Sequence, residues 1–119
     1  MPSIAAVRVA PNHFSSKAEV LLEITRDDLW PVTVHQGGFA AAPLHCHVAP
    51  VRIYVFSGAL LVNGGRTCPV IVATVGARVD IPAGAVHTVS AEGPVVTITA
   101  FTSPAFAASL PQLPVPDDA

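Results

Sequence analysis

Three histidines of this chain, His45, His47 and His87, have the residue type and the spacing that a metal site needs. Neutral imidazole is a common ligand for zinc, copper, iron and nickel ions. His45 and His47 are separated by one residue, and alternate side chains of an extended segment point to the same face. His87 must come from a distant strand, and the Pro82-Ala-Gly84 turn before it can direct that strand back across a barrel. Only a metal site predicts that all three side chains converge.

The segment around the first two histidines resembles the first motif of the cupin family. His45, His47 and Gly58 stand at the positions of the motif's two histidines and its second glycine. Gly38 lies one residue early for the first glycine, and Val51 stands where the family has a glutamate. The resemblance therefore implies a metal site of three histidines that lacks the usual carboxylate.

The segment around the third histidine resembles the second motif of the same family. The matching residues follow one another without a gap: Gly76, Pro82, Gly84 and His87. Ala91 replaces an asparagine that is frequent in the family. The two motifs together imply an all-β, cupin-like jelly-roll barrel, and the resemblance covers roughly residues 36 to 101.

The distribution of β-branched residues independently favours an all-β barrel or sandwich over helices. These residues gather in short runs separated by glycine, proline and asparagine. The expected strands are Glu19–Thr25, Val32–Gln36, Phe39–His45, Arg52–Phe56, Ala59–Val62, Thr67–Ala73, Arg78–Ile81, His87–Ala91 and Val95–Phe101. Asn63-Gly64-Gly65 predicts a hairpin turn, because asparagine and glycine tolerate positive φ. Asp27-Asp28 is expected to begin one short helical turn at most.

The chain of 119 residues is long enough for one domain with a buried core and too short for two. We expect residues 1–30 to form an arm that adds strands to the barrel or to a partner subunit, and residues 31–102 to form the barrel core. Residues 103–119 are a proline-rich tail, in which a regular sheet strand is unfavourable because proline cannot donate a ladder hydrogen bond.

The residues after the first motif predict an apolar pocket. If strand alternation holds from Val51 onward, then Val51, Ile53 and Val55 point into the barrel and Arg52 points away from it. A change of phase in the preceding loop would exchange these roles. Phe101 on the last core strand is expected to line the same pocket. Such walls favour a small, mostly hydrophobic ligand.

Loss of the carboxylate changes the expected chemistry of the metal. Three neutral imidazoles leave a divalent cation its full +2 charge, so the open positions should favour an anionic bidentate ligand. In this the chain is similar to the iron-dependent thiol dioxygenases and β-diketone-cleaving dioxygenases of the cupin family. The resemblance implies ferrous iron as the favoured ion, with zinc, nickel and manganese as alternatives, and a small β-dicarbonyl, thiol or similar bidentate substrate.

Two other functions remain open. A metal-dependent isomerase or hydrolase would need a general base beside the ion. The best positioned candidate is His35, with Tyr54 behind it, although His35 is better interpreted as a partly exposed strand residue. A non-enzymatic module that binds or senses a small ligand would need no such base. The scarcity of catalytic side chains near the three histidines favours such a module, whereas the absence of an effector domain such as a helix-turn-helix in this chain favours an enzyme, which is the narrowly preferred expectation.

Composition limits the partners. The formal charge of −2 offers no basic surface for nucleic acid, and no run of about twenty apolar residues could form a membrane helix. The chain is 51% hydrophobic and only 12% charged, which favours a homodimer that buries apolar surface. Without the pattern of a secretory leader at the start, the expected location is cytoplasmic, where Cys46 and Cys68 would stay reduced.

Overall fold

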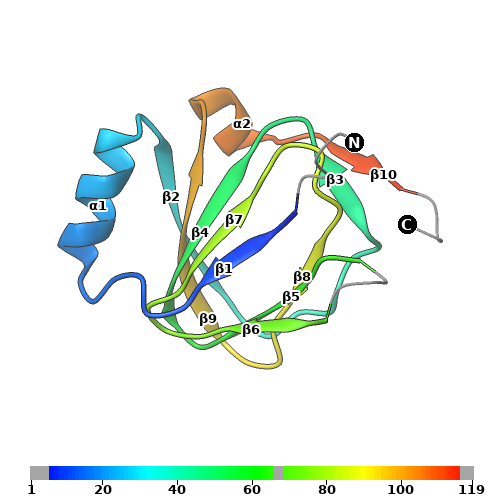
Figure 1. Ribbon diagram of the computed structural model, residues 1–119, viewed down its shortest axis with the longest axis horizontal. Coiled ribbons are helices and arrows are strands. Elements are labelled where there is room, and N and C mark those ends of the chain that lie inside the picture. The colour runs from blue at the N-terminus through cyan, green and yellow to red at the C-terminus, as the bar shows by residue number, and fades with distance from the viewer. Residues whose placement is uncertain (1–5, 66–68, 116–119) are drawn as a thin grey trace.

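The protein is described by a computed structural model that covers residues 6–65 and 69–115 (Figure 1). Its helices are α1 (Lys17–Arg26) and α2 (Pro104–Ala108). Its strands are β1 (Arg8–Ala10), β2 (Trp30–Gln36), β3 (His45–His47), β4 (Val51–Ser57), β5 (Leu60–Asn63), β6 (Ile71–Ala73), β7 (Arg78–Ile81), β8 (Thr88–Ser90), β9 (Val95–Phe101) and β10 (Gln112–Pro114). The architecture is mostly β, as the sequence predicts.

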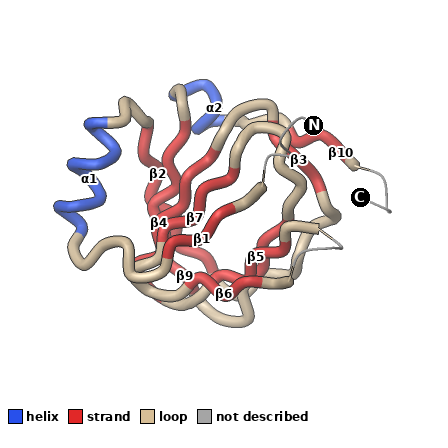
Figure 2. Tube along the Cα trace, viewed as in Figure 1, coloured by secondary structure: helices blue, strands red, loops and turns tan. Residues whose placement is uncertain are grey.

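Two main sheets and one strand pair make up the barrel-like body (Figure 2). The larger sheet has the strand order β1-β7-β4-β9-β2, and the smaller has the order β6-β5-β8. β3 pairs with β10. All of the strand pairs are antiparallel, and a register shift between β4 and β9 follows Val55. β4 therefore lies in the middle of the larger sheet, between β7 and β9.

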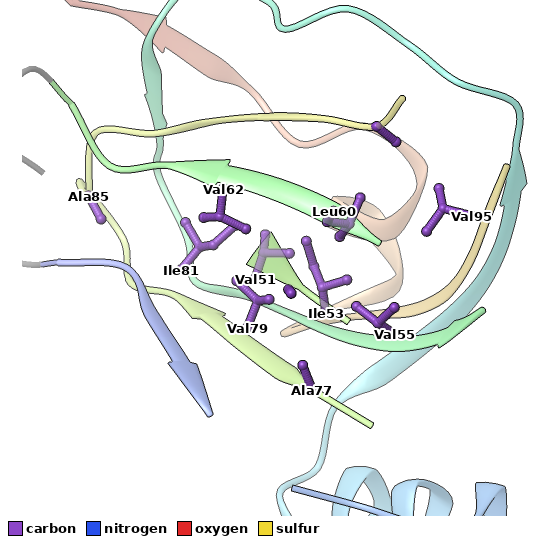
Figure 3. Close-up of a cluster of buried hydrophobic side chains, with 12 residues drawn as sticks. Val51, Ile53, Val55, Leu60, Val62, Ala77, Val79, Ile81, Ala85 and Val95 are labelled. Atoms are coloured by element: carbon purple, nitrogen blue, oxygen red, sulfur yellow. The ribbon is translucent and has the colours of Figure 1, made fainter. Parts of the chain in front are cut away.

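The main core lies between the two sheets (Figure 3). It combines Val51, Ile53 and Val55 of β4 with Leu60 and Val62 of β5, and all five side chains are at most 8% exposed. Their spacing of two residues reflects strand alternation, because every second side chain of each strand faces the opposing sheet. The predicted phase of β4 is therefore confirmed, with Arg52 directed away from the core.

Helix α1 covers the outer face of the larger sheet, on the left of Figure 1. The prediction of a strand at Glu19–Thr25 is wrong. Ser16 caps the helix, because its Oγ accepts a hydrogen bond from the backbone N–H of Glu19 (3.3 Å). Val20 and Ile24, one helical turn apart, are buried against the sheet. The helix ends at Asp27 rather than beginning there.

Most of the other predicted strands are confirmed. β7 and β9 have the expected bounds, and β2, β4, β5, β6 and β8 overlap the expected ranges. The segment predicted as Phe39–His45 is different, because only Phe39 makes an isolated bridge, to Ala91, before β3 begins at His45. Part of the expected Thr67–Ala73 strand, including Cys68, lies outside the described residues.

The C-terminal segment contains more regular structure than its prolines suggest. Pro104 begins α2, where a missing N–H costs nothing, and Ser103 caps that helix. Residues 112–114 then pair with β3 as β10, with Pro114 at the end of the strand. The expectation that this tail forms no regular strand is wrong for these residues. Proline is tolerated there because β10 lies at the edge of its sheet.

Neither helix among the described residues has the length and apolar character needed to cross a membrane.

Candidate metal centre

The three histidines of the two sequence motifs converge. Each offers a ring nitrogen, and these atoms lie within 4.8 Å of one another. The ring centroids of His45 and His87 are 4.6 Å apart, those of His47 and His87 are 4.7 Å apart, and those of His45 and His47 are 5.0 Å apart. This grouping places three potential metal ligands around one point.

A backbone bridge between distant segments creates this convergence. The N–H of His45 donates to the carbonyl of His87 (3.1 Å), and the N–H of His87 donates to the carbonyl of His45 (2.9 Å). Residues paired in this way carry their side chains on the same face. His47, two residues further along β3, shares that face by alternation.

The turn before His87 is anchored to the first motif. Gly84 has φ of +78°, which favours glycine, and its N–H donates to the carbonyl of His47 (2.9 Å). The N–H of Ala85 donates to the carbonyl of Pro82 (3.1 Å). The proline and glycine of the second motif therefore form a tight turn that is bound to the strand carrying the other two histidines.

Backbone carbonyls orient two of the imidazole rings. Nδ1 of His45 lies 2.8 Å from the carbonyl oxygen of Pro43, and Nδ1 of His87 lies 2.9 Å from that of Ala85. A carbonyl oxygen can only accept, so each Nδ1 carries the proton and donates it. Each Nε2 is then left with a free lone pair, which is the arrangement found in metal-binding histidines.

The third imidazole has an unpaired atom. Nδ1 of His47 is the one buried side-chain nitrogen or oxygen among the described residues without a hydrogen-bond partner. Burial, followed by the neighbouring imidazoles of His87 and His45, lowers the pKa of His47 to about 4. Burial also lowers the pKa of His87. Neutral rings with free lone pairs are the form that binds a cation, so the three residues fit a divalent metal ion.

A cavity of ≈330 Å³ adjoins the cluster. Its walls carry no charged side chain. They consist of Phe39, Ala40, Ala42, His45, His47, Val51, Ile53, Ile81, His87, Thr88, Val89, Thr99, Phe101, Leu110 and Gln112. Val51, Ile53 and Phe101 are thus three of the residues named from the sequence as pocket-lining. Val55 is fully buried in the same core but is not part of this wall.

The two candidate general bases lie elsewhere. The hydroxyl of Tyr54 donates to Oε1 of Glu23 on helix α1 (2.7 Å), and burial raises the pKa of Tyr54 to about 12. His35 lines a different cavity together with Lys17 of helix α1 and Phe56. Phe56 packs with α1 on the outer face of the larger sheet, so this cavity lies outside the core between the sheets. The structure therefore brings neither Tyr54 nor His35 to the histidine cluster.

Sequence reasoning missed several cavity residues. Leu110 and Gln112 belong to the tail that was expected to lack regular structure, and no local pattern there indicates a contact with the histidines. Thr99 was not missed in this way, because its alternation with Phe101 on β9 predicts that both side chains line the same wall. Cys46 pairs with Leu113 and, by alternation, faces away from the two histidines that flank it.

Comparisons with known proteins identify the fold. No protein family model and no curated protein sequence matches the chain. Among solved structures, it is similar to a protein of unknown function with a cupin-like fold from Ralstonia eutropha JMP134. The identity is 22%, the TM-score is 0.50, and the match covers 64% of this chain and 48% of the other. This chain therefore spans about half the length of that relative.

Two further structures agree over more of this chain. A cupin superfamily protein from Desulfitobacterium hafniense has 8% identity and a TM-score of 0.53, with 85% of this chain and 81% of that chain covered. Oxalate decarboxylase from Lactobacillus farciminis, in a formate complex, has 17% identity and a TM-score of 0.52, with 87% and 30% covered. At such identities the likeness concerns the fold, and the protein has a cupin-like β fold with a three-histidine cluster inside it.

Proposed function

We propose that His45, His47 and His87 bind a divalent metal ion, at which a small bidentate ligand reacts with molecular oxygen. The observation that carries the metal proposal is the convergence of three imidazoles, two of them oriented by carbonyls and the third with an unpaired buried nitrogen. Three neutral ligands leave the ion with its full charge and with open coordination positions.

Ferrous iron is the favoured ion. Imidazole nitrogens also suit zinc and nickel, whereas manganese prefers oxygen ligands and is the less favoured alternative, so the three histidines limit the choice of metal without deciding it. When bound, iron would supply oxygen activation and would hold an anionic ligand. The protein would supply the orientation of the three imidazoles and a cavity beside them whose walls carry no charged side chain.

The proposed reaction is a dioxygenation. A 1,3-dicarbonyl compound and O₂ would give a carboxylic acid and an α-oxo aldehyde or ketone through cleavage of one carbon–carbon bond. A thiol and O₂ would give a sulfinic acid. In both cases the substrate supplies the electrons and both oxygen atoms enter the products. Such substrates ionise to anions with two donor positions or one soft donor, which the charge of the site favours.

The isomerase or hydrolase alternative has less support. That chemistry needs a group that moves protons beside the ion, and apart from the histidines the cavity wall has only two hydroxyls and one amide as polar side chains. The same scarcity favours the other alternative, a module that binds or senses a small ligand without converting it. The oxygen-uptake experiment below separates that module from the dioxygenase.

Elemental analysis of the untagged protein tests the metal centre. We expect near-stoichiometric metal in the wild type and little in His87→Ala. His35→Ala is the matched control, because it removes an exposed histidine from β2 without touching the cluster. Circular dichroism would establish that both variants are folded. Equal metal in the wild type and a folded His87→Ala variant would overturn the proposed centre.

Oxygen consumption tests the reaction. Protein loaded anaerobically with ferrous iron would be given pentane-2,4-dione, cysteamine or 3-mercaptopropionate, and oxygen uptake would be followed with an electrode. We expect uptake that depends on one of these substrates and disappears in His87→Ala. Iron binding without uptake across a broad series of 1,3-dicarbonyls and thiols would support the ligand-binding module instead.

The homodimer and the cytoplasmic location both remain proposals. Val70, just before the edge strand β6, is 54% exposed, and Ile71 and Val72 within that strand are 40% and 54% exposed; a dimer interface would cover such apolar side chains. Sedimentation equilibrium would test the first proposal, and fractionation of the source cells would test the second.

A further inference from the structure

The C-terminal segment completes the wall of the histidine cavity. After β9 the chain passes through α2, and β10 then lies beside β3 (Figure 1). Leu110 packs against the core between the sheets, and Gln112 pairs with His47. Directly opposed residues of an antiparallel pair carry their side chains on the same face. Gln112 therefore lies beside a histidine of the cluster, at the exposed margin of the cavity.

Few groups in this cavity can donate a hydrogen bond to a ligand. The hydroxyl of Thr88 already donates to the carbonyl of Ala42 (2.8 Å). Among the described residues, the side chains of Thr99 and Gln112 are the remaining non-histidine polar groups of the wall, and neither makes a hydrogen bond within that part of the structure. A carboxamide offers two N–H donors without adding a charge, whereas a threonine hydroxyl offers one donor.

We propose that Gln112 is a ligand-selecting residue, whose side-chain N–H donates to an oxygen of a small anionic chelator bound at the three-histidine centre. This inference rests on the proposed metal site and concerns which anions that site accepts. An anion in an uncharged cavity gains from a neutral donor near its oxygen atoms, because hydrogen bonds to charged acceptors are the stronger ones. A carboxylate at the same position would repel it.

Ligand binding to the cobalt-loaded protein tests this role without any turnover. Co²⁺ affinity would first be measured for each protein by competition with a chromophoric chelator. Acetohydroxamate, a small anion that chelates through two oxygens, would then be titrated while the visible absorption of the cobalt is followed. Imidazole, a neutral nitrogen ligand, would be titrated in parallel as a probe that offers no oxygen.

We expect Gln112→Leu to bind acetohydroxamate about tenfold more weakly than the wild type, with little change for imidazole or for cobalt itself. Gln112→Glu should bind it more weakly still, because a second negative charge stands near the ligand. Leu113→Ala is the control for disturbance of β10, since Leu113 is exposed on the other face of the strand. Thr99→Val tests the competing donor.

The outcomes separate the two proposals. Cobalt binding with equal acetohydroxamate affinity in the wild type and Gln112→Leu would overturn the role of Gln112 and leave the metal centre standing. An equal loss in Leu113→Ala, or a loss in Thr99→Val alone, would overturn it as well. Failure of the wild type to bind cobalt would overturn the metal centre and, with it, this inference.

Discussion

The inner and outer faces of β4 differ in the charge of the side chains around them. Val51 and Ile53 face inward to a cavity whose polar groups are imidazoles, hydroxyls and an amide. Arg52 and Tyr54, the residues that alternate with them, face outward to a charged cluster beneath helix α1. One strand thus separates an uncharged chamber from a network of ion pairs, because its side chains alternate between the faces.

The outer network is centred on Glu23. Its Oε1 accepts from Tyr54 (2.7 Å) and from Nη1 of Arg78 (2.6 Å), and its carboxylate lies 2.9 Å from Nε2 of His13. Burial would raise the pKa of Glu23, but the hydrogen bonds from Tyr54 and His13 and the charge of Arg78 outweigh it and lower that pKa to about 2. The outer face thus contains an ionised carboxylate with a structural role, whereas the cavity wall contains no carboxylate.

Arg52 extends the same network. Its Nη1 donates to Asp27 at the end of α1 (2.7 Å), and its Nε donates to Asp80 on β7 (3.3 Å). These contacts join the helix to two strands of the sheet. Ion pairs thus stabilise the attachment of α1 on the outer face, whereas the absence of charged side chains from the cavity wall would leave a divalent ion there with its full charge.

The largest expected effect is on the outer face. Glu23→Ala should lower the free energy of unfolding by about 3 kcal/mol, because it leaves the half-buried Arg78 and the buried Tyr54 without their shared acceptor. Urea unfolding would measure this loss, with Leu22→Ala on the exposed side of α1 as the control. Metal stoichiometry should not change. Loss of metal by folded Glu23→Ala would show that the two faces are coupled.

Acid should weaken the outer face through Glu23. The pKa of Glu23 is lower in the folded protein than its usual value of 4.5, so the unfolded chain binds more protons and stability rises with pH. This contribution is present above about pH 4.5 and is lost as the pH falls toward 2. After allowance for solvent screening we expect a loss of about 2 kcal/mol. In urea unfolding from pH 7 to pH 2.5, the loss of stability should be about 2 kcal/mol smaller in Glu23→Gln than in the wild type, and His47, whose pKa is also lowered, should contribute to the loss that remains.

Placing a carboxylate on the inner face would test the comparison by removing the difference in charge between the two faces. Val51→Glu places an acid on the cavity wall that the histidines share, and we expect about tenfold tighter binding of a divalent ion, or about 1.4 kcal/mol. Val51→Gln is the matched control, since it has similar shape and no charge. Competition with a chelator would measure both. Unchanged affinity in a folded Val51→Glu protein would mean that this side chain does not reach the ion.

The smallest expected effects come from two backbone positions, one for each face. Ser16→Ala removes the cap of α1, and Gly84→Ala puts a side chain on a residue with φ of +78°; each should cost about 1 kcal/mol of stability. Only Gly84→Ala should weaken metal binding, because its turn precedes His87. Thermal unfolding and chelator competition on both variants would check this. Equal metal affinity in the two variants would show that the turn at Gly84 does not determine the placement of His87.

The histidine cluster is the part of the structure that follows most directly from local sequence. His45 and His47 share a face because strand side chains have a period of two, and the Pro82-Ala-Gly84 turn precedes the third ligand. The phase of β4 was predictable for the same reason. These features depend on short-range geometry, which residue types and spacing express.

Helix α1 shows where local reasoning stops. Val20, Ile24 and Thr25 are β-branched and favour a strand when only their type is considered. The helix forms because Ser16 caps it, because Val20 and Ile24 meet the outer face of the sheet, and because Glu23 meets Tyr54 and Arg78 there. The cap at Ser16 is a local signal, but the sheet, Tyr54 and Arg78 are distant from α1 in the chain. These tertiary contacts override the local preference for a strand.

The sequence by itself thus determined a mostly β fold, the three histidines that could bind a metal, the missing carboxylate and the inward phase of Val51. Only the tertiary structure decided that Tyr54 donates its hydrogen bond to Glu23 and does not reach the histidines. Only the tertiary structure also decided that Gln112 of the C-terminal segment lies beside His47. The physical reason is the range of the interactions. Alternation and turn geometry act over a few residues, whereas the pairing of β10 with β3 and of α1 with the sheet joins segments that only the folded chain brings together.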